Sequence, residues 1–158
     1  MQIRMKTEKR EPRFVTASEW VDSPEFKSSY LPMSVELLKK INNDPELLRW
    51  CKSYSVYEKQ DSHFELYEDI EWFFHATYAE GLVVTDYQKY LDGLRVRNHA
   101  IIEADEAWLE GLSLCQLLSV LAFHFRWDYH CNGSLISESI ASGAMLRIIH
   151  ELSQRFTL

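Results

Sequence analysis

Apolar residues recur every three or four positions over long stretches of the chain, a period typical of amphipathic helices. The strongest stretch runs from Leu114 to Phe125, where apolar residues lie on nearly every side of the expected helix. We therefore expect this helix to be central and buried from several directions. A second stripe, from Met145 to Phe156, has the i, i+3, i+4, i+7 spacing of a helix with one buried face. No alternating strand pattern competes, so the pattern predicts an all-α protein.

Proline and glycine divide the chain into helix starts and helix stops. All four prolines lie in the first third of the sequence and all five glycines come later, and proline suits a first turn whereas glycine suits the position after a last turn. We expect Gly133 and Gly143 to end helices, at least one of them with a positive φ angle. The side chains that we expect to cap helix N-termini are Ser18, Ser23, Ser34, Asp44, Ser62 with Glu65, Thr85 or Asp86, and Ser113.

These elements fit one domain of 17–158, an orthogonally packed all-α bundle of about six to eight helices. Residues 1–16 form a basic N-terminal arm that we expect to be disordered. Its cations are Arg4, Lys6, Lys9, Arg10 and Arg13. Such an arm can touch nucleic acid weakly, but five charges without interleaved aromatic residues are better explained as a solvated terminus.

The chain is acidic overall, with a formal net charge of -7, and many of its acids lie between Glu65 and Glu110. This balance disfavours non-specific nucleic-acid binding and favours a basic protein partner. The longest apolar run is too short to span a bilayer, and the basic N-terminus lacks the apolar segment of a secretory signal. The three cysteines show no CxxC spacing, which favours reduced thiols. We therefore expect a cytoplasmic protein without membrane contact.

Polar groups gather where the central helix is expected to end. They are His124, Arg126, Asp128 and His130, with Cys131 beside them. One interpretation is a small enzymatic or ligand-binding site in which Asp128 orients an imidazole, or a metal site with His130 and Cys131. The other is a capped helix end, where Arg126 donates to unpaired carbonyl groups and Asp128 accepts from backbone amides. We favour the second, because zinc ligands are usually paired more tightly, and we expect no metal and no cofactor.

A second group of acids raises the question of a cation site. Its members are Glu103, Asp105, Glu106 and Glu110. Their spacing matches no EF-hand loop, and we attribute them to the first turn of a helix, where negative charge is favourable. The chain contains no P-loop, GxGxxG, HExxH or GxSxG motif. No complete catalytic motif is therefore present.

Two blocks of sequence resemble an uncharacterised bacterial family, a domain of unknown function. The first is Arg126-Trp-Asp-Tyr-His-Cys-Asn-Gly-Ser-Leu followed by Ser142-Gly143-Ala-Met-Leu-Arg-Ile-Ile, which is similar to the family's C-terminal signature. The second, Tyr78-Ala-Glu-Gly-Leu-Val-Val-Thr-Asp-Tyr, is similar to its middle block. Tyr129-His130 departs from the arginine-phenylalanine pair of that signature. The resemblance covers roughly the second half of the chain; it implies an α-helical fold and no particular activity.

Two classes of function remain open. The first is a non-catalytic, acidic interaction protein that binds or neutralises another protein, as immunity, antitoxin or phage counter-defence proteins do. Its expected binding surface combines tyrosines with acids: Tyr54, Tyr57, Glu65, Tyr67, Glu68, Asp69 and Glu71. The alternative is a small enzyme or ligand-binding domain that uses the cluster from Arg126 to His130. An enzyme needs these groups in a concave pocket, whereas a binder needs only an acidic surface.

Overall fold

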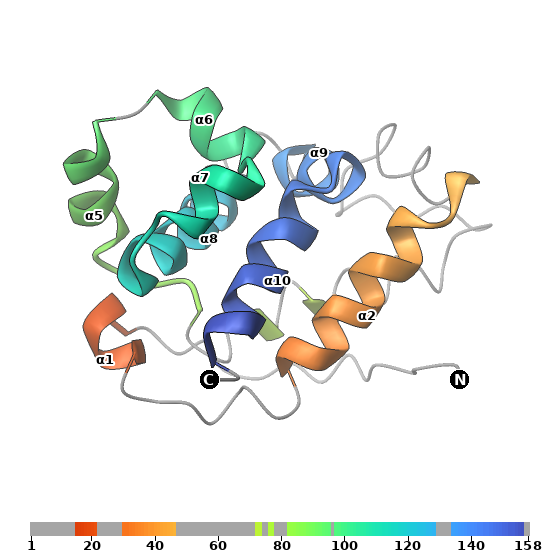
Figure 1. Cartoon of the computed structure of the whole chain (residues 1–158), viewed down its shortest axis with the longest axis horizontal. Helices are drawn as coiled ribbons and strands as arrows, with labels where there is room; N and C mark the ends of the chain where they lie inside the picture. The colour runs from red at the N-terminus through yellow and green to blue at the C-terminus, as the bar shows by residue number, and fades with distance from the viewer. Residues whose placement is uncertain are drawn as a thin grey trace.

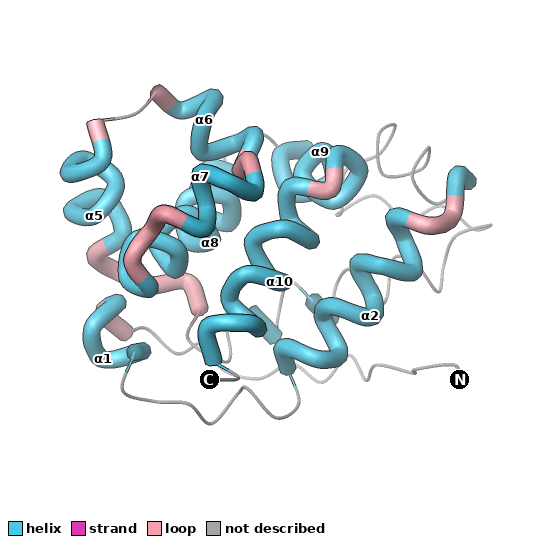
Figure 2. The backbone as a smooth tube through the Cα atoms, in the orientation of Figure 1, coloured by secondary structure: helices cyan, strands magenta, loops and turns pink. Residues whose placement is uncertain are grey.

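The computed structural model describes residues 15–21, 30–46, 72–73, 76–77, 82–95, 97–128 and 134–156. Within these ranges the chain forms eight α-helices and no strand (Figures 1 and 2), which confirms the predicted all-α fold. The helices are α1 (Ala17–Val21), α2 (Tyr30–Asn42), α5 (Tyr87–Leu94), α6 (Asn98–Glu103), α7 (Glu106–Glu110), α8 (Leu114–Asp128), α9 (Ser134–Ser142) and α10 (Ala144–Phe156). None of these helices is long and apolar enough to cross a membrane.

Helix α8 forms the centre of the molecule, as its apolar sequence predicts. Leu117, Leu118 and Leu121 have no exposed surface and Phe125 is also buried. The helix packs against α1, α5, α6, α9 and α10. Ser113 begins it with the predicted cap: its hydroxyl accepts from the Gln116 amide at 3.2 Å, while its own amide donates to the Gln116 side chain at 2.9 Å.

Helix α10 packs against both the central helix α8 and helix α2. Its predicted stripe is buried, with Met145, Ile148, Ile149 and Leu152 all inaccessible to solvent. These side chains pack against α8 and α2, and α10 also contacts α7 and α9. In Figure 1 it runs through the middle of the view, with α2 on one side of it and α6 and α7 on the other. The polar side of α10 therefore lies between α2 on one side and α6 and α7 on the other.

The segment before α1 is fixed to the start of α5. The Val15 carbonyl accepts from the Thr85 amide at 2.8 Å, and the Ala17 amide donates to Asp86 Oδ1 at 2.9 Å. Asp86 precedes α5 but makes no capping bond to it, because its carboxylate bonds the first residue of α1 instead. The rest of the predicted arm, residues 1–14, lies outside the described part of the chain. So do Ser23, Ser62 and Glu65.

Thr16, rather than the expected Ser18, caps α1. Its hydroxyl accepts from the Glu19 amide at 3.3 Å and donates to Glu19 Oε1 at 2.8 Å, while the Thr16 amide bonds the same carboxylate at 3.2 Å. These bonds favour the charged carboxylate and lower the pKa of Glu19. The pattern is a capping box of Thr and Glu three residues apart.

The predicted cap at Ser34 is wrong. Helix α2 begins four residues earlier, at Tyr30, so that Pro32 lies in the first turn, where its missing N–H costs no hydrogen bond. Ser34 is consequently inside the helix, fully buried, and its hydroxyl has no hydrogen-bond partner. Asp44 does act as predicted, since its carboxylate accepts from the Glu46 amide at 3.0 Å.

Glycine ends fewer helices than the sequence suggests. Gly143 separates α9 from α10 with a φ of +86°, as predicted. Helices α5 and α6 end instead at Arg95 and Ala104, which have φ angles of 53° and 47°, while Gly93 lies inside α5. Gly133 lies outside the described residues. Two residues with side chains therefore adopt a conformation that glycine takes more easily. The Arg147 side chain holds one of them through the Ala104 carbonyl oxygen.

Removing the Leu121 side chain tests the central position of α8. We expect Leu121→Ala to lower the free energy of unfolding by about 2–5 kcal/mol, because a cavity replaces fully buried methyl groups. Leu94→Ala removes the same atoms from a half-buried site and should cost less. Denaturant melting measures both changes, and a loss below about 0.5 kcal/mol for Leu121→Ala would contradict its position in the core.

Alanine at Gly143 and at Gly93 should have opposite effects. A Cβ at Gly143 would lie 3.1 Å from Arg147 Nη1 and 3.4 Å from Asn42 Oδ1, on a backbone with positive φ, so we expect a loss of about 1–2 kcal/mol. A Cβ at Gly93 meets nothing within 4 Å, and Gly93→Ala should gain about 0.5–1 kcal/mol from its helical position. Thermal or denaturant melting measures the change in unfolding free energy for both variants. Equal changes would be inconsistent with the positive φ angle at Gly143.

Candidate functional site

The polar cluster expected at the end of α8 is only partly described, and its first member points into the core. His124 has no exposed surface, and its Nδ1 lies 2.9 Å from the Val120 carbonyl oxygen. Arg126 is half-buried, and its Nε has no hydrogen-bond partner, so the predicted fork to the helix end is not observed at that atom. The Asp128 side chain, His130 and Cys131 lie outside the described residues. A ligand from solvent therefore has no access to His124.

Burial dominates the protonation of His124. Desolvation lowers its pKa, while the hydrogen bond to Val120 and the nearby Ile102 carbonyl act in the opposite direction. A neutral ring donates from one nitrogen only, and Nε2 is buried without a partner at hydrogen-bond geometry. The side chain thus belongs to the packing between α8 and α6, and the low dielectric keeps it neutral.

The surface expected to bind a partner cannot be placed. All of its residues lie outside the described part of the chain: Tyr54, Tyr57, Glu65, Tyr67, Glu68, Asp69 and Glu71. The candidate site that the structure does describe is built by α6, α7, α9 and α10.

Two arginines of α10 bind the ends of α6 and α7. Arg147 donates to the carbonyl oxygens of Glu103 at 2.7 Å and Ala104 at 2.9 Å, where α6 ends. Arg155, two turns later, donates to the Glu110 carbonyl at 3.0 Å, where α7 ends, and pairs with Glu151 at 2.8 Å. These are the arginine forks that we expected at Arg126, and they act between helices far apart in the sequence.

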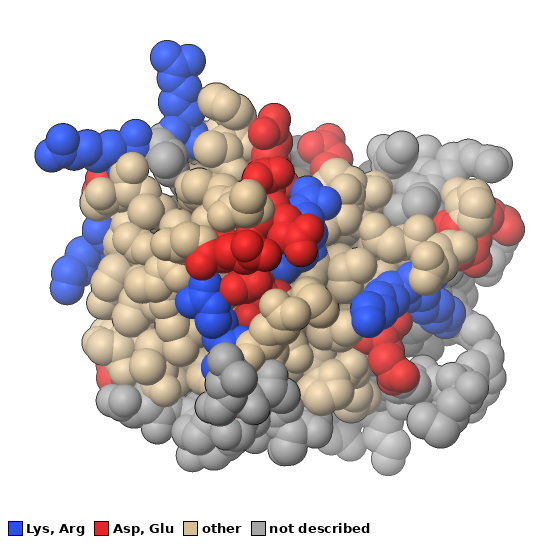
Figure 3. Space-filling view, in the orientation of Figure 1, with Lys and Arg blue, Asp and Glu red and all other residues tan. Residues whose placement is uncertain are grey.

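Acidic side chains surround these contacts and form one surface. We call it the acidic face; its residues, all exposed, are Glu103, Asp105, Glu106, Glu110 and Glu138. Figure 3 shows Asp and Glu side chains gathered at the centre of this view, over α6, α7 and α10. The predicted explanation holds for Glu106, which lies in the first turn of α7. It is wrong for Glu103 and Glu110, which are the last residues of α6 and α7.

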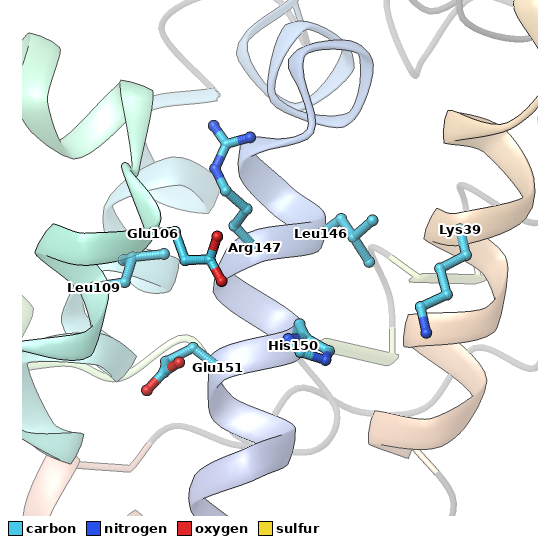
Figure 4. Close-up of a pocket in the computed structure, with 7 residues that line it drawn as sticks. All are labelled: Lys39, Glu106, Leu109, Leu146, Arg147, His150 and Glu151. Atoms are coloured by element: carbon cyan, nitrogen blue, oxygen red, sulfur yellow. The ribbon is translucent and has the colours of Figure 1, made fainter.

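The acidic face has a hollow on each side of Arg147. One, of about 240 Å³, lies between α2, α7 and α10 (Figure 4). Leu109 and Leu146 form its apolar part, Glu106 lies on one side, and Lys39 and His150 lie on the other. The other hollow, of about 400 Å³, lies between α6, α9 and α10 and is lined by three carboxylates. The first therefore mixes both signs of charge, while the second is predominantly acidic.

The profile of a family of unknown function, DUF6508, matches residues 35–157. The chain belongs to this family. The match confirms the predicted resemblance to an uncharacterised domain family, without testing the individual signature blocks. No curated protein and no solved structure matches the chain. The DUF6508 region begins inside α2 and includes every residue of the acidic face.

Acid should destabilise this DUF6508 protein through His124. The pKa of His124 is lowered in the folded chain, so the unfolded chain takes up the proton first as the pH falls. The stabilisation is complete above the unfolded value of about 6.5 and is lost below it. We expect His124→Gln to flatten the fall in unfolding free energy between about pH 6.5 and 5. Equal slopes in the wild-type protein and the variant would refute this assignment.

Proposed function

We propose that this DUF6508 protein is a non-catalytic interaction protein that binds a basic partner protein through its acidic face. The observation that carries this proposal is the position of Glu103 and Glu110 at the C-terminal ends of α6 and α7. The last carbonyl groups of a helix carry partial negative charge, so a carboxylate there costs stability. Acids at two such positions are better explained by binding than by folding.

The nearby arginines leave these carboxylates free. Arg147 and Arg155 use their donors on backbone carbonyl oxygens of α6 and α7. The only acid that either arginine pairs with in the described chain is Glu151. The carboxylates of Glu103 and Glu110 consequently have no ion-pair partner in the described ranges. A basic partner would meet charge that the fold has not neutralised.

A surface of this kind favours rapid, selective encounter with a protein of opposite charge. Complementary potentials raise association rates and reject like-charged competitors, and both effects weaken with salt. Immunity, antitoxin and phage counter-defence proteins act by such binding, and we place this protein in that class. The tyrosines and acids that the sequence predicts to bind, between Tyr54 and Glu71, lie outside the described residues. The reduced-cysteine pattern, with Cys115 a free thiol, supports action in the cytoplasm.

Removing charge from the acidic face should slow partner binding. The test variant combines Glu103→Gln, Asp105→Asn and Glu106→Gln; the control combines Glu36→Gln, Glu46→Gln and Asp92→Asn, which are exposed acids outside the acidic face. Both triple variants remove three negative charges, so they change the net charge equally. We expect the association rate at low salt to fall about tenfold or more in the test variant and to stay near wild type in the control.

The partner is first identified by capture with wild-type protein, followed by mass spectrometry, and is then purified. Stopped-flow mixing measures the association rate at several salt concentrations. A captured protein that is not basic, or that binds both variants equally fast, would refute the proposal.

A further inference from the structure

The hollow between α2, α7 and α10 is a concave site with an apolar part. Its volume is about 240 Å³, which exceeds the roughly 150 Å³ of a protein cavity that holds benzene. Leu109 of α7 and Leu146 of α10 supply the apolar surface (Figure 4). Sites for small molecules usually have this form, in which apolar side chains surround a few polar groups. The hollow can therefore hold an apolar group about the size of one six-membered ring.

Two of the charged side chains that line this hollow are already bonded within the fold. Arg147 donates to the carbonyl oxygens of Glu103 and Ala104. Glu151 accepts from the Arg155 guanidinium at 2.8 Å. These bonds fix the α10 side of the hollow before a ligand arrives, and a preformed site loses less entropy when it binds. The charge of a matching ligand is therefore set by the side chains that remain unbonded.

The unbonded side chains put two nitrogen donors on one side of the hollow. Lys39 and His150 line it without a hydrogen bond or ion pair in the described part of the chain. Figure 4 shows both on the α2 side of α10, the side to which Leu146 also points. An ammonium and an imidazole N–H beside apolar surface match a carboxylate attached to an apolar body. Glu106, on the α7 side, repels a second negative charge, which favours a monoanion over a dianion such as phosphate.

We propose that this hollow binds a small monocarboxylic acid with a compact apolar body, such as an arylacetic acid. The carboxylate accepts hydrogen bonds from Lys39 and His150, and the apolar body covers Leu109 and Leu146. The hollow shares Glu106 with the acidic face, but its ligand does not depend on a partner protein. The same chemistry occurs in a free acid and at the C-terminal residue of a peptide, so the test includes a probe for each.

Titration with phenylacetate, followed by the backbone amide chemical shifts of the labelled full chain, tests the site. We expect saturable shifts at Lys39, Leu109, Leu146 and His150, with half-saturation on the order of 1 mM for so small a molecule. Phenylacetamide has the same shape without the charge and should bind at least about fivefold more weakly. Nα-acetylphenylalanine carries the carboxylate and ring on a peptide unit. Tighter binding of this probe than of phenylacetate assigns the site to a peptide C-terminus, and weaker binding assigns it to a free acid.

Matched variants separate the charge from the apolar contact. Lys39→Met removes the ammonium and keeps most of the stem, so it should weaken phenylacetate about fivefold and leave phenylacetamide nearly unchanged. Lys89→Met makes the same change at an exposed lysine outside the hollow and should weaken phenylacetate less than about twofold. Leu146→Ala should weaken both probes about threefold, because it removes apolar surface that both of them cover.

Three results would overturn the inference. They are shifts that grow linearly with phenylacetate and never saturate, equal weakening by Lys39→Met and Lys89→Met, and tighter binding of phenethylammonium than of phenylacetate. Lys39 is exposed, so its replacement should preserve the fold, which the spectrum of each variant without a probe verifies. The association rate with a basic partner is measured separately, so this inference and the proposed function can each fail alone.

Discussion

The contacts of Arg147 and Arg155 with the ends of α6 and α7 hold the acidic face together. Helices of six and five residues are too short to be stable alone, and their last carbonyl groups need donors from elsewhere. Both arginines come from α10, whose opposite side is anchored by Ile148, Ile149 and Leu152 in the core. The acidic face therefore takes its shape from a buried helix that contributes little of the acidic charge itself.

Arg147 and Arg155 bond backbone carbonyl groups of α6 and α7 rather than the carboxylates of these helices, which affects the charge of the surface. Had Arg147 and Arg155 paired with Glu103 and Glu110, the two helices would still be linked, but only three of the five carboxylates of the acidic face would be left without a cation. Because the guanidinium groups instead neutralise the negative ends of α6 and α7, the carboxylates keep their full charge facing solvent. In Glu103 and Glu110 the main-chain carbonyl group thus contributes to stability, while the side chain is left for the proposed recognition.

The sequence predicted what depends on local pattern. The apolar surround of α8, the cap at Ser113 and the glycine stop at Gly143 all follow from residues within a few positions of one another, and the structure confirms them. Errors arose where a second local signal or a tertiary contact overrides propensity. Ser34 is a favourable cap, but Pro32 in the first turn allows α2 to begin earlier. Arg147 bonds carbonyl groups 43 and 44 residues away, and no local spacing could reveal that pairing or the hollow beside it.

The two classes of function, enzyme and interaction protein, require different properties of a site. An active site needs a titratable group that is both perturbed and reachable. Burial between α8 and α6 lowers the pKa of His124, so this group is perturbed. The same burial leaves the ring out of reach of a ligand from solvent. On the acidic face, the carboxylates are exposed and have no ion-pair partner among the described residues. Chemistry at His124 would require the core to open, whereas the proposed recognition would use carboxylates that are already exposed.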